Sequence, residues 1–458
     1  MMKFHCIMLV VLMILQLPVK AQKIITPEHP DIIYWGRVDF TNAEMPAFEH
    51  AGVTIRARFT GSSIKATFND FAIHGPTTTN YMYAIVDENT PIKVELLKGT
   101  NTYTFATGLS DGAHTLQIVK LTEANVGRVA FLGFQLDDKG QLQSLEDEPQ
   151  CHIEFIGNSI TCGYGNEVSI PAPPQGNPTS GFTSVNENNY WAWGYITSRN
   201  LGMKYSAVSY SGRGLYRNNS GLMEGTLPKI YSKIFPDDAK SPLWNHAAVH
   251  PDYIVIDLGT NDFFTDPANP LSQQSFESTY VDFVRELKQY HPAATVILAV
   301  GVMMSDGYPS GAQQWTRIRT YVKNAVNTLT YSGLNNIYYF EMAPQSPPYG
   351  EDWHPARHTH QRMADELTIF IKAHSKTCSS TLGSQNKDSG LESISIYPNP
   401  AGTILNIRYP GKENDWMIVS ENGKEIIKGK GHVADISTLK TGTYFVKMQH
   451  HSFKFIKN

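Results

Sequence analysis

The sequence has few cysteines, little net charge and no long hydrophobic run after its first residues. Four cysteines occur in 458 residues and none forms a CxxC pair, which disfavours a cysteine-ligated metal or redox site. The formal net charge is -4, so no electrostatic feature favours nucleic acid or an anionic membrane as partner. No later stretch approaches the ~20 apolar residues of a membrane span. These absences favour a globular protein without a membrane span.

The N-terminal stretch has the layout of a secretory signal peptide. Lys3 gives a short basic start, an apolar run covers residues 7–15, and a small residue, Ala21, ends a suitable cleavage site. The apolar run is too short to cross a bilayer. We expect residues 1–21 to be removed and the mature protein to be soluble and exported.

Three cysteines remain after this cleavage: Cys151, Cys162 and Cys378. An odd number in a compartment that permits disulfides leaves at least one thiol unpaired. A bridge between Cys151 and Cys378 would join the two ends of one domain, but the sequence does not exclude pairing of Cys162 with either one.

Residues 22–148 are predicted to form an all-β sandwich of jelly-roll type. The segments "GVTIRARF" and "SSIKATF" alternate apolar and polar residues, and turns such as "FTGSS" and "LSDGAH" separate them. Residues 149–375 then alternate apolar strands with amphipathic helices such as "THQRMADELTIFIKAH". This pattern predicts a mostly parallel sheet between two helical layers, with ligands outside the carboxyl ends of its strands. A polar linker, 376–391, precedes a small β-module, 392–458.

Reactive residues stand at several of these strand ends. Ser159 follows the strand "HIEFIG", Gly212 follows "KYSAVSYS", Asn261 follows "YIVIDLGT", and the pair Asp352 and His354 precedes the last helix. A serine hydroxyl needs a base to accept its proton and donors to stabilise an oxyanion. Singly, each of these residues also fits an ordinary turn or a structural histidine, but together they predict a serine esterase site.

The segments "FIGNSITCGYG", "YSGRG", "LGTND" and "DWHP" resemble the four blocks of the SGNH (GDSL-type) hydrolases. The resemblance implies a flavodoxin-like three-layer domain and a Ser–His–Asp triad. It implies the roles of nucleophile for Ser159 and base for His354. The oxyanion hole would consist of the N–H groups of Ser159 and Gly212 and the side chain of Asn261. No metal and no cofactor are implied.

A narrower resemblance is to carbohydrate esterase family 2, carried by "IYWGRV", "SGRGLYRN", "EGTLPKIY" and "DWHP…THQRMA". Members of that family join a jelly roll to an SGNH domain and remove acetyl groups from xylan or mannan. The resemblance implies Asp352 as the orienting acid, with Glu351 as the fallback. Some members use a backbone carbonyl instead, so the three alternatives stay open.

An acetylated polysaccharide or oligosaccharide is the expected partner. Trp353, Arg213, Asp262 and Trp191 are the predicted substrate-contacting residues, although Trp191 also fits helix packing and Arg213 an ordinary salt bridge. A lipase or thioesterase on the same core, and a catalytically silent carbohydrate-binding protein, are the competing hypotheses.

The C-terminal stretches "SISIYPNPAGTILNI" and "LKTGTYFVKM" resemble the sorting domain of the type IX secretion system of Bacteroidetes. The resemblance implies that the tail is recognised by that machinery and that the protein is secreted or displayed on the cell surface. A small carbohydrate-binding β-module is the alternative.

Overall fold

The structure is a computed structural model that describes residues 22–146, 148–168, 181–263, 270–374, 395–397, 401–408, 415–420, 424–448 and 451–457. The expected signal peptide, 1–21, and linker, 376–391, lie outside these residues. The chain divides into two units, Met1–Leu382 and Gly383–Asn458, which are described separately.

Strands alone make up the first part of the chain, here called the sandwich domain. They are β1 Gln22–Ile25, β2 Ile32–Trp35, β3 Ala47–Phe48, β4 Thr54–Thr60, β5 Ile64–Asp70, β6 Tyr81–Val86, β7 Ile92–Glu95, β8 Gly99–Ala106, β9 Ala113–Lys120, β10 Val129–Asp137 and β11 Gln141–Gln143. They form two antiparallel sheets, β1-β10-β5-β8 with β3 on β10, and β11-β4-β9-β6-β7 with β2 on β4. Every second residue of β5 is buried, as the alternating sequence predicts, and side chains such as Phe59, Phe68 and Phe131 fill the core between the sheets.

A parallel sheet forms the centre of the next part, the α/β domain. Its strands are β12 His152–Gly157, β13 Lys204–Ser209, β14 Tyr253–Asp257, β15 Thr295–Val300 and β16 Ile337–Glu341, in the order β13-β12-β14-β15-β16. This is the flavodoxin-like order, and β12 and β14 flank the point where the connections reverse direction. The chain ends that follow β12 and β14 therefore meet at one crevice.

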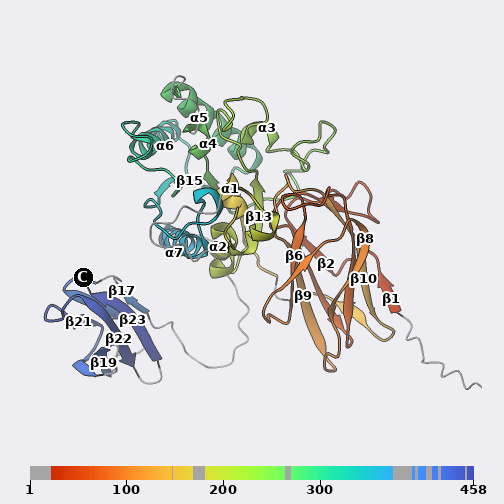
Figure 1. The fold of residues 1–458 in the computed structure, drawn as a ribbon, viewed down its shortest axis with the longest axis horizontal. Coiled ribbons are helices and arrows are strands. Elements are labelled where there is room, and N and C mark those ends of the chain that lie inside the picture. Colours follow the sequence, from red (N-terminus) through yellow and green to blue (C-terminus); the bar gives the residue numbers. More distant parts are fainter. Residues whose placement is uncertain are drawn as a thin grey trace, which may run out of the picture. The chain divides into compact units, whose positions relative to one another are not determined.

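Long helices cover both faces of this sheet. Figure 1 shows α2 (Trp193–Leu201) and α7 (Arg357–His374) on one side, and α5 (Gln273–Tyr290) and α6 (Gln314–Tyr331) on the other. One buried cluster joins β15 to α5 and α6, and another joins β12 to α2 and α7. In α7 the buried residues Met363, Leu367 and Ile371 lie on one face, as predicted, and α2 ends at Gly202 with a φ of 61°.

Shorter helical segments hold the loops at the carboxyl edge. They are α1 Ser159–Cys162, α3 Leu227–Ile230, α4 Thr260–Phe263, η1 Ser184–Asn186, η2 Asn189–Trp191 and η3 Glu351–Trp353. The described part of the chain has no helix with the length and apolar character that a membrane crossing requires.

The structure shows the bonding state of two of the three remaining cysteines. Cys151 is disulfide-bonded, whereas Cys162 is a buried free thiol. The pairing of Cys162 that the sequence left open is therefore excluded. Cys378 lies outside the described residues.

The C-terminal unit is a small β-structure of two antiparallel sheets. Its strands are β17 Ser395–Tyr397, β18 Ile404–Arg408, β19 Asp415–Ser420, β20 Glu425–Lys430, β21 Val433–Asp435, β22 Gly442–Met448 and β23 His451–Lys457. Leu405, Trp416, Val446 and Phe455 lie in its core.

Candidate active site

Ser159 is fixed by a tight turn between β12 and α1. A Cβ on Gly157 would lie 2.1 Å from Thr161 Oγ1, so the turn needs a glycine. Asn158 caps α1, because its side chain accepts a hydrogen bond of 3.0 Å from the N–H of Ile160. Ser159 thus opens the helix with 8% of its surface exposed, at the end of a central strand.

His354 faces this serine. Its Nε2 lies 2.7 Å from Ser159 Oγ, and its Nδ1 lies 3.0 Å from the backbone carbonyl oxygen of Glu351. A carbonyl oxygen only accepts, so we assign the ring proton to Nδ1. Nε2 then carries the lone pair and accepts the hydrogen bond from the serine hydroxyl. This is the tautomer that a general base requires.

Of the three orienting groups that the sequence left open, the structure places a backbone carbonyl, that of Glu351, and not the Asp352 carboxylate against His354. That carboxylate accepts hydrogen bonds from the Tyr164 hydroxyl at 2.6 Å and the Gly181 N–H at 2.8 Å. The fallback, Glu351, contacts His354 only through its carbonyl. The reason is local backbone geometry: Asp352 and Trp353 have left-handed φ values of 48° and 60°, and in this turn the preceding carbonyl contacts the imidazole.

Tyr164 supports the imidazole from one face. The two rings stack with centroids 4.0 Å apart and planes inclined by 21°. Because the Asp352 carboxylate binds the hydroxyl of Tyr164, it supports His354 indirectly, through the Tyr164 ring. Sequence reasoning missed this role, although Tyr164 stands inside the first block that it singled out.

Burial dominates the titration of His354. It lowers the pKa of the imidazole to about 4, whereas the Glu351 carbonyl and the Asp352 charge act in the raising direction. A base must be neutral, so activity should persist as pH falls below 6.5 and be lost only near pH 4. We expect kcat/KM for a soluble acetyl ester to fall to half its maximum on the acid side near pH 4. A midpoint at or above 6.5, with the enzyme still folded by circular dichroism, would contradict this assignment.

Two further strand ends carry the residues predicted to donate to the oxyanion. Gly212, in the loop after β13, has a φ of 77°, and Asn261 lies in α4 after β14 with 8% of its surface exposed. The Asn261 amide donates one hydrogen bond of 2.7 Å to the carbonyl of Arg213. An amide nitrogen carries two hydrogens, so one remains for an oxyanion. The N–H of Tyr210 also bonds the carbonyl of Gly157 at 3.2 Å, which joins the loop to the serine turn.

Replacement of Asn261 by alanine tests this arrangement. Loss of one oxyanion donor typically lowers kcat by about 10²–10³. We expect Asn261→Ala to show such a fall on 4-nitrophenyl acetate, with KM within threefold and little change in melting temperature. A decrease in kcat below fivefold would remove Asn261 from the oxyanion hole.

The four predicted substrate contacts differ in their outcomes. The prediction for Asp262 is wrong, because its buried carboxylate accepts from the N–H groups of Leu215, Tyr216 and Arg217 at 2.7–3.0 Å. It therefore shapes the loop that follows Gly212.

The other three contacts stay predictions. Arg213 forms an ion pair of 2.8 Å with Asp237. Trp191 is partly buried, and the Arg357 guanidinium lies 4.1 Å from its ring centroid. Trp353 is 50% exposed next to His354, which suits a sugar contact best of the three.

A cavity of about 490 Å³ is lined by residues from both domains. Asn166 and Glu167 reach it from the turn after Ser159, Arg357 from the segment after His354, and Lys93 from the sandwich domain. Lys93 Nζ lies 2.7 Å from Glu167, so the polar wall is held together by an ion pair.

Three family models match consecutive parts of the chain. Residues 34–145 match the carbohydrate esterase 2 N-terminal model, and residues 155–374 match the GDSL-like lipase/acylhydrolase family. Residues 395–458 match the secretion system C-terminal sorting domain. These matches confirm the three resemblances drawn from the sequence.

Proteins with similar sequences are named as esterases. The cellulase/esterase CelE of Acetivibrio thermocellus is 34% identical over 347 residues, which cover 75% of this chain and 40% of CelE. The chain therefore spans less than half of that relative. An acetylxylan esterase / glucomannan deacetylase of Cellvibrio japonicus is 25% identical, with 76% of this chain and 90% of the relative covered.

Solved structures share the fold as well. The structure of a family two carbohydrate esterase from Clostridium thermocellum, in complex with cellohexaose, is 33% identical with a TM-score of 0.67. The match covers 75% of this chain and 98% of that one.

Proposed function

Because the chain belongs to carbohydrate esterase family 2, we propose that it is a secreted serine esterase that removes O-acetyl groups from polysaccharides such as xylan or mannan. The observation that carries the proposal is the 2.7 Å contact between Ser159 Oγ and a His354 imidazole whose tautomer is fixed by a backbone carbonyl. A hydroxyl aligned on a neutral base is the arrangement of an activated nucleophile.

Acylation begins as Ser159 Oγ attacks the acetyl carbonyl carbon and His354 Nε2 takes the hydroxyl proton. The resulting oxyanion is stabilised by the N–H groups of Ser159 and Gly212 and by the Asn261 amide. When this intermediate collapses, the bond to the sugar oxygen breaks and His354 returns the proton to that oxygen. The products are a deacetylated sugar hydroxyl and an acetyl-serine.

Deacylation repeats these steps with water. His354 takes a proton from the attacking water, and the same three donors stabilise the second oxyanion. Collapse releases acetate and returns the proton to Ser159 Oγ. The backbone carbonyl of Glu351 stabilises the imidazolium that forms in each step, in place of a carboxylate.

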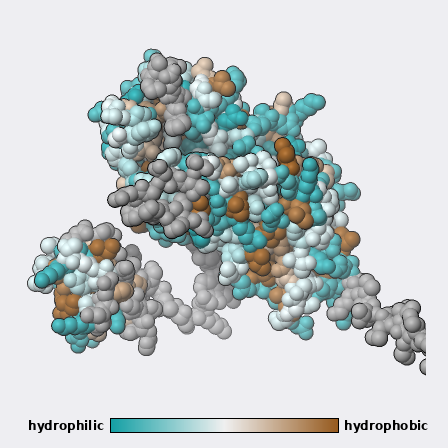
Figure 2. Space-filling view, viewed as in Figure 1, coloured by the Kyte–Doolittle hydropathy of each residue, from teal (hydrophilic) through white to brown (hydrophobic). Residues whose placement is uncertain are grey.

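A sugar substrate suits the surroundings of the site better than a lipid. The neighbouring cavity, whose lining does not include Ser159 or His354, carries Lys93, Glu167 and Arg357, which can bond sugar hydroxyls. Next to His354 itself, Trp353 offers an exposed ring. On the face seen in Figure 2, apolar residues form separate small groups among hydrophilic ones. The Cellvibrio japonicus relatives are named for xylan and glucomannan, and the Clostridium thermocellum structure holds cellohexaose.

Export is the remaining part of the proposal. The sorting-domain match at 395–458 supports delivery by a type IX secretion system to the cell surface or beyond. The expected signal peptide at 1–21 would supply the first membrane crossing.

The test compares ester classes with one enzyme preparation. Acetate release from acetylated xylan and acetylated glucomannan is measured beside hydrolysis of 4-nitrophenyl acetate and 4-nitrophenyl palmitate. We expect acetate from at least one polymer and negligible palmitate hydrolysis. Hydrolysis of nitrophenyl esters without acetate release would leave an SGNH esterase of non-sugar substrates. No hydrolysis and no labelling by a fluorophosphonate would favour a silent carbohydrate-binding protein.

A further inference from the structure

We propose that Glu123, a residue of the sandwich domain, is a positioning residue for the oxyanion hole. This proposal rests on the proposed function, because a positioning role for Glu123 presumes that Gly212 takes part in ester hydrolysis. Glu123 lies between β9 and β10, and its side chain reaches the loop of the α/β domain that carries Gly212. The sandwich domain would thereby complete the catalytic site.

The contact is made to the residue directly before Gly212. Glu123 Oε2 accepts a hydrogen bond of 2.7 Å from the N–H of Ser211, and Oε1 accepts one from the Ser211 hydroxyl. Bonds from two donors of Ser211 to one carboxylate fix the position of the residue that precedes Gly212. On the other side of Gly212, its carbonyl accepts a bond of 2.9 Å from the N–H of Asn219. The glycine whose N–H is to meet the oxyanion is therefore held from both sides.

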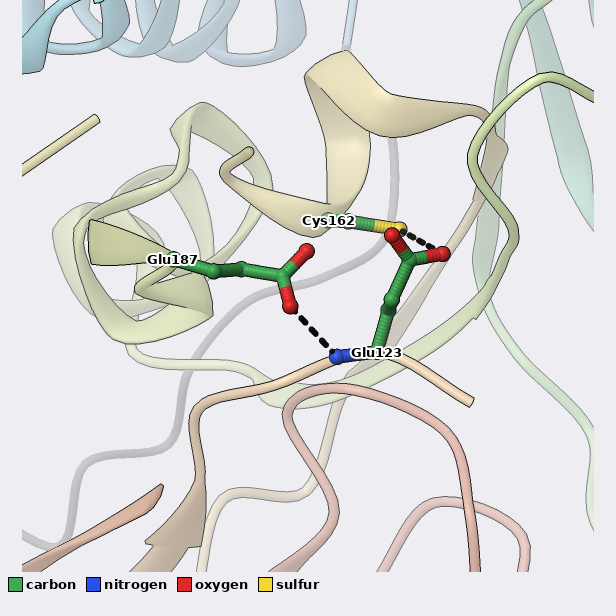
Figure 3. Close-up of side chains that lie close together, drawn as sticks. All are labelled: Glu123, Cys162 and Glu187. Carbon is green, nitrogen blue, oxygen red and sulfur yellow. Dashed lines mark hydrogen bonds between the residues drawn. The ribbon is translucent and has the colours of Figure 1, made fainter. Parts of the chain in front are cut away.

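The same carboxylate also contacts the nucleophile helix. Cys162, three residues after Ser159, places its Sγ 3.7 Å from Glu123 Oε2 (Figure 3). Glu123 thus lies between α1, which presents Ser159, and the loop that presents Gly212. One side chain sets the relation between the attacking oxygen and one of the proposed oxyanion donors.

Glu123 is itself rigidly placed. Buried Lys120 donates from Nζ to the carbonyl oxygens of Thr122 and Glu123, at 2.6 Å and 3.1 Å. The N–H of Glu123 donates a bond of 2.9 Å to Glu187 Oε2, as Figure 3 shows. Lys120 and Glu187 thus hold the backbone of Glu123 in place, and its side chain is free to bond Ser211.

This arrangement is costly for a purely structural residue. Glu123 and Glu187 are both buried, and Glu187 Oε1 has no hydrogen-bond partner in the described structure. Burial and the neighbouring Glu123 raise the pKa of the Glu187 carboxyl well above its ordinary range. If Glu123 served only to fill space, a neutral glutamine would remove the cost of burying an acid and stabilise the protein.

The experiment measures steady-state kinetics and melting temperature for Glu123→Gln, Glu123→Ala and a control, Asp238→Asn. Asp238 also bonds the sandwich domain, through Arg128 at 3.1 Å, but it has no part in the serine site. We expect Glu123→Ala to lower kcat for 4-nitrophenyl acetate about 30- to 100-fold with KM within threefold, a part of the 10²–10³ for a lost donor. Glutamine keeps one acceptor for Ser211, so we expect a five- to tenfold lower kcat with an unchanged or higher melting temperature.

The outcomes separate this inference from the proposed function. Wild-type kcat in Glu123→Gln, with a raised melting temperature, would overturn the positioning role and leave the esterase standing. One equivalent of tightly bound metal per chain would also overturn it, because Glu123, Cys162 and Glu187 lie close enough to be joint ligands. Wild-type protein without any esterase activity would overturn both. If Glu123→Ala does not fold, Glu123→Gln alone decides.

Discussion

Ser159→Ala is expected to lower acetate release and nitrophenyl acetate hydrolysis by about 10⁶, the loss found when a serine hydrolase loses its nucleophile. The hydroxyl is the group that His354 Nε2 contacts at 2.7 Å, and a methyl group cannot form the acetyl intermediate. The change removes one oxygen atom at a residue with 8% exposure, so we expect little change in melting temperature.

A matched control is available in α2. Ser198 is buried and donates to the carbonyl of Tyr195 at 2.8 Å, away from the serine turn. Ser198→Ala should keep kcat within twofold. Oligosaccharide affinity, measured by calorimetry, should be the same for wild type and Ser159→Ala. Residual activity above one tenth, or a fluorophosphonate adduct on another residue, would remove Ser159 as the nucleophile.

The fold was predictable from the sequence because each pattern has one dominant physical meaning. Strand β14 is buried along its whole length, and only a sheet covered on both faces buries such a strand. Alternation in β5 likewise fits a sheet with one buried face. The helix α7 buries Met363, Leu367 and Ile371 at the expected spacing. These local signals do not depend on contacts between distant parts of the chain.

The pairing of Ser159 with His354 could also be predicted from the sequence, because both residues stand at the carboxyl edge of one parallel sheet. The orienting group could only be narrowed to three alternatives, one of which was the backbone carbonyl that contacts His354. Asp352 precedes His354 by two residues, and sequence spacing cannot reveal two consecutive left-handed residues at 352 and 353. These dihedral angles decide whether a side chain or a carbonyl meets the imidazole.

Glu123 illustrates a second limit of sequence reasoning. It lies in a loop of the sandwich domain, 88 residues before Ser211, and "KLTEAN" carries no catalytic spacing. A single acid in a polar loop is read as a solvated side chain. Only the packing of two domains shows that this residue is buried and bonded to the loop beside Ser159.

His354→Ala and Asp352→Asn should differ by orders of magnitude, and the difference tests the carbonyl-supported pair. Without His354 no base accepts the Ser159 proton, so we expect kcat to fall by about 10⁴–10⁶. In a triad whose acid contacts the imidazole, the corresponding Asp-to-Asn change costs about 10⁴, because the wrong tautomer is stabilised. Here the proton on Nδ1 is bonded to the Glu351 carbonyl, which the Asp352 side chain does not alter.

We therefore expect Asp352→Asn to lower kcat by less than tenfold. Asparagine can still accept the hydroxyl of Tyr164 and so keep that ring stacked on His354. Tyr164→Phe, which removes this bond altogether, should also have a small effect, and the two changes combined should not add, because without the hydroxyl the side chain at 352 has no bond left to alter. A fall near 10⁴ in Asp352→Asn would show that the carboxylate moves onto the imidazole during catalysis. Similar small losses of kcat in Asp352→Asn and Tyr164→Phe would instead show that Asp352 acts on His354 only through Tyr164. The backbone carbonyl of Glu351 would then be the third member of the catalytic group.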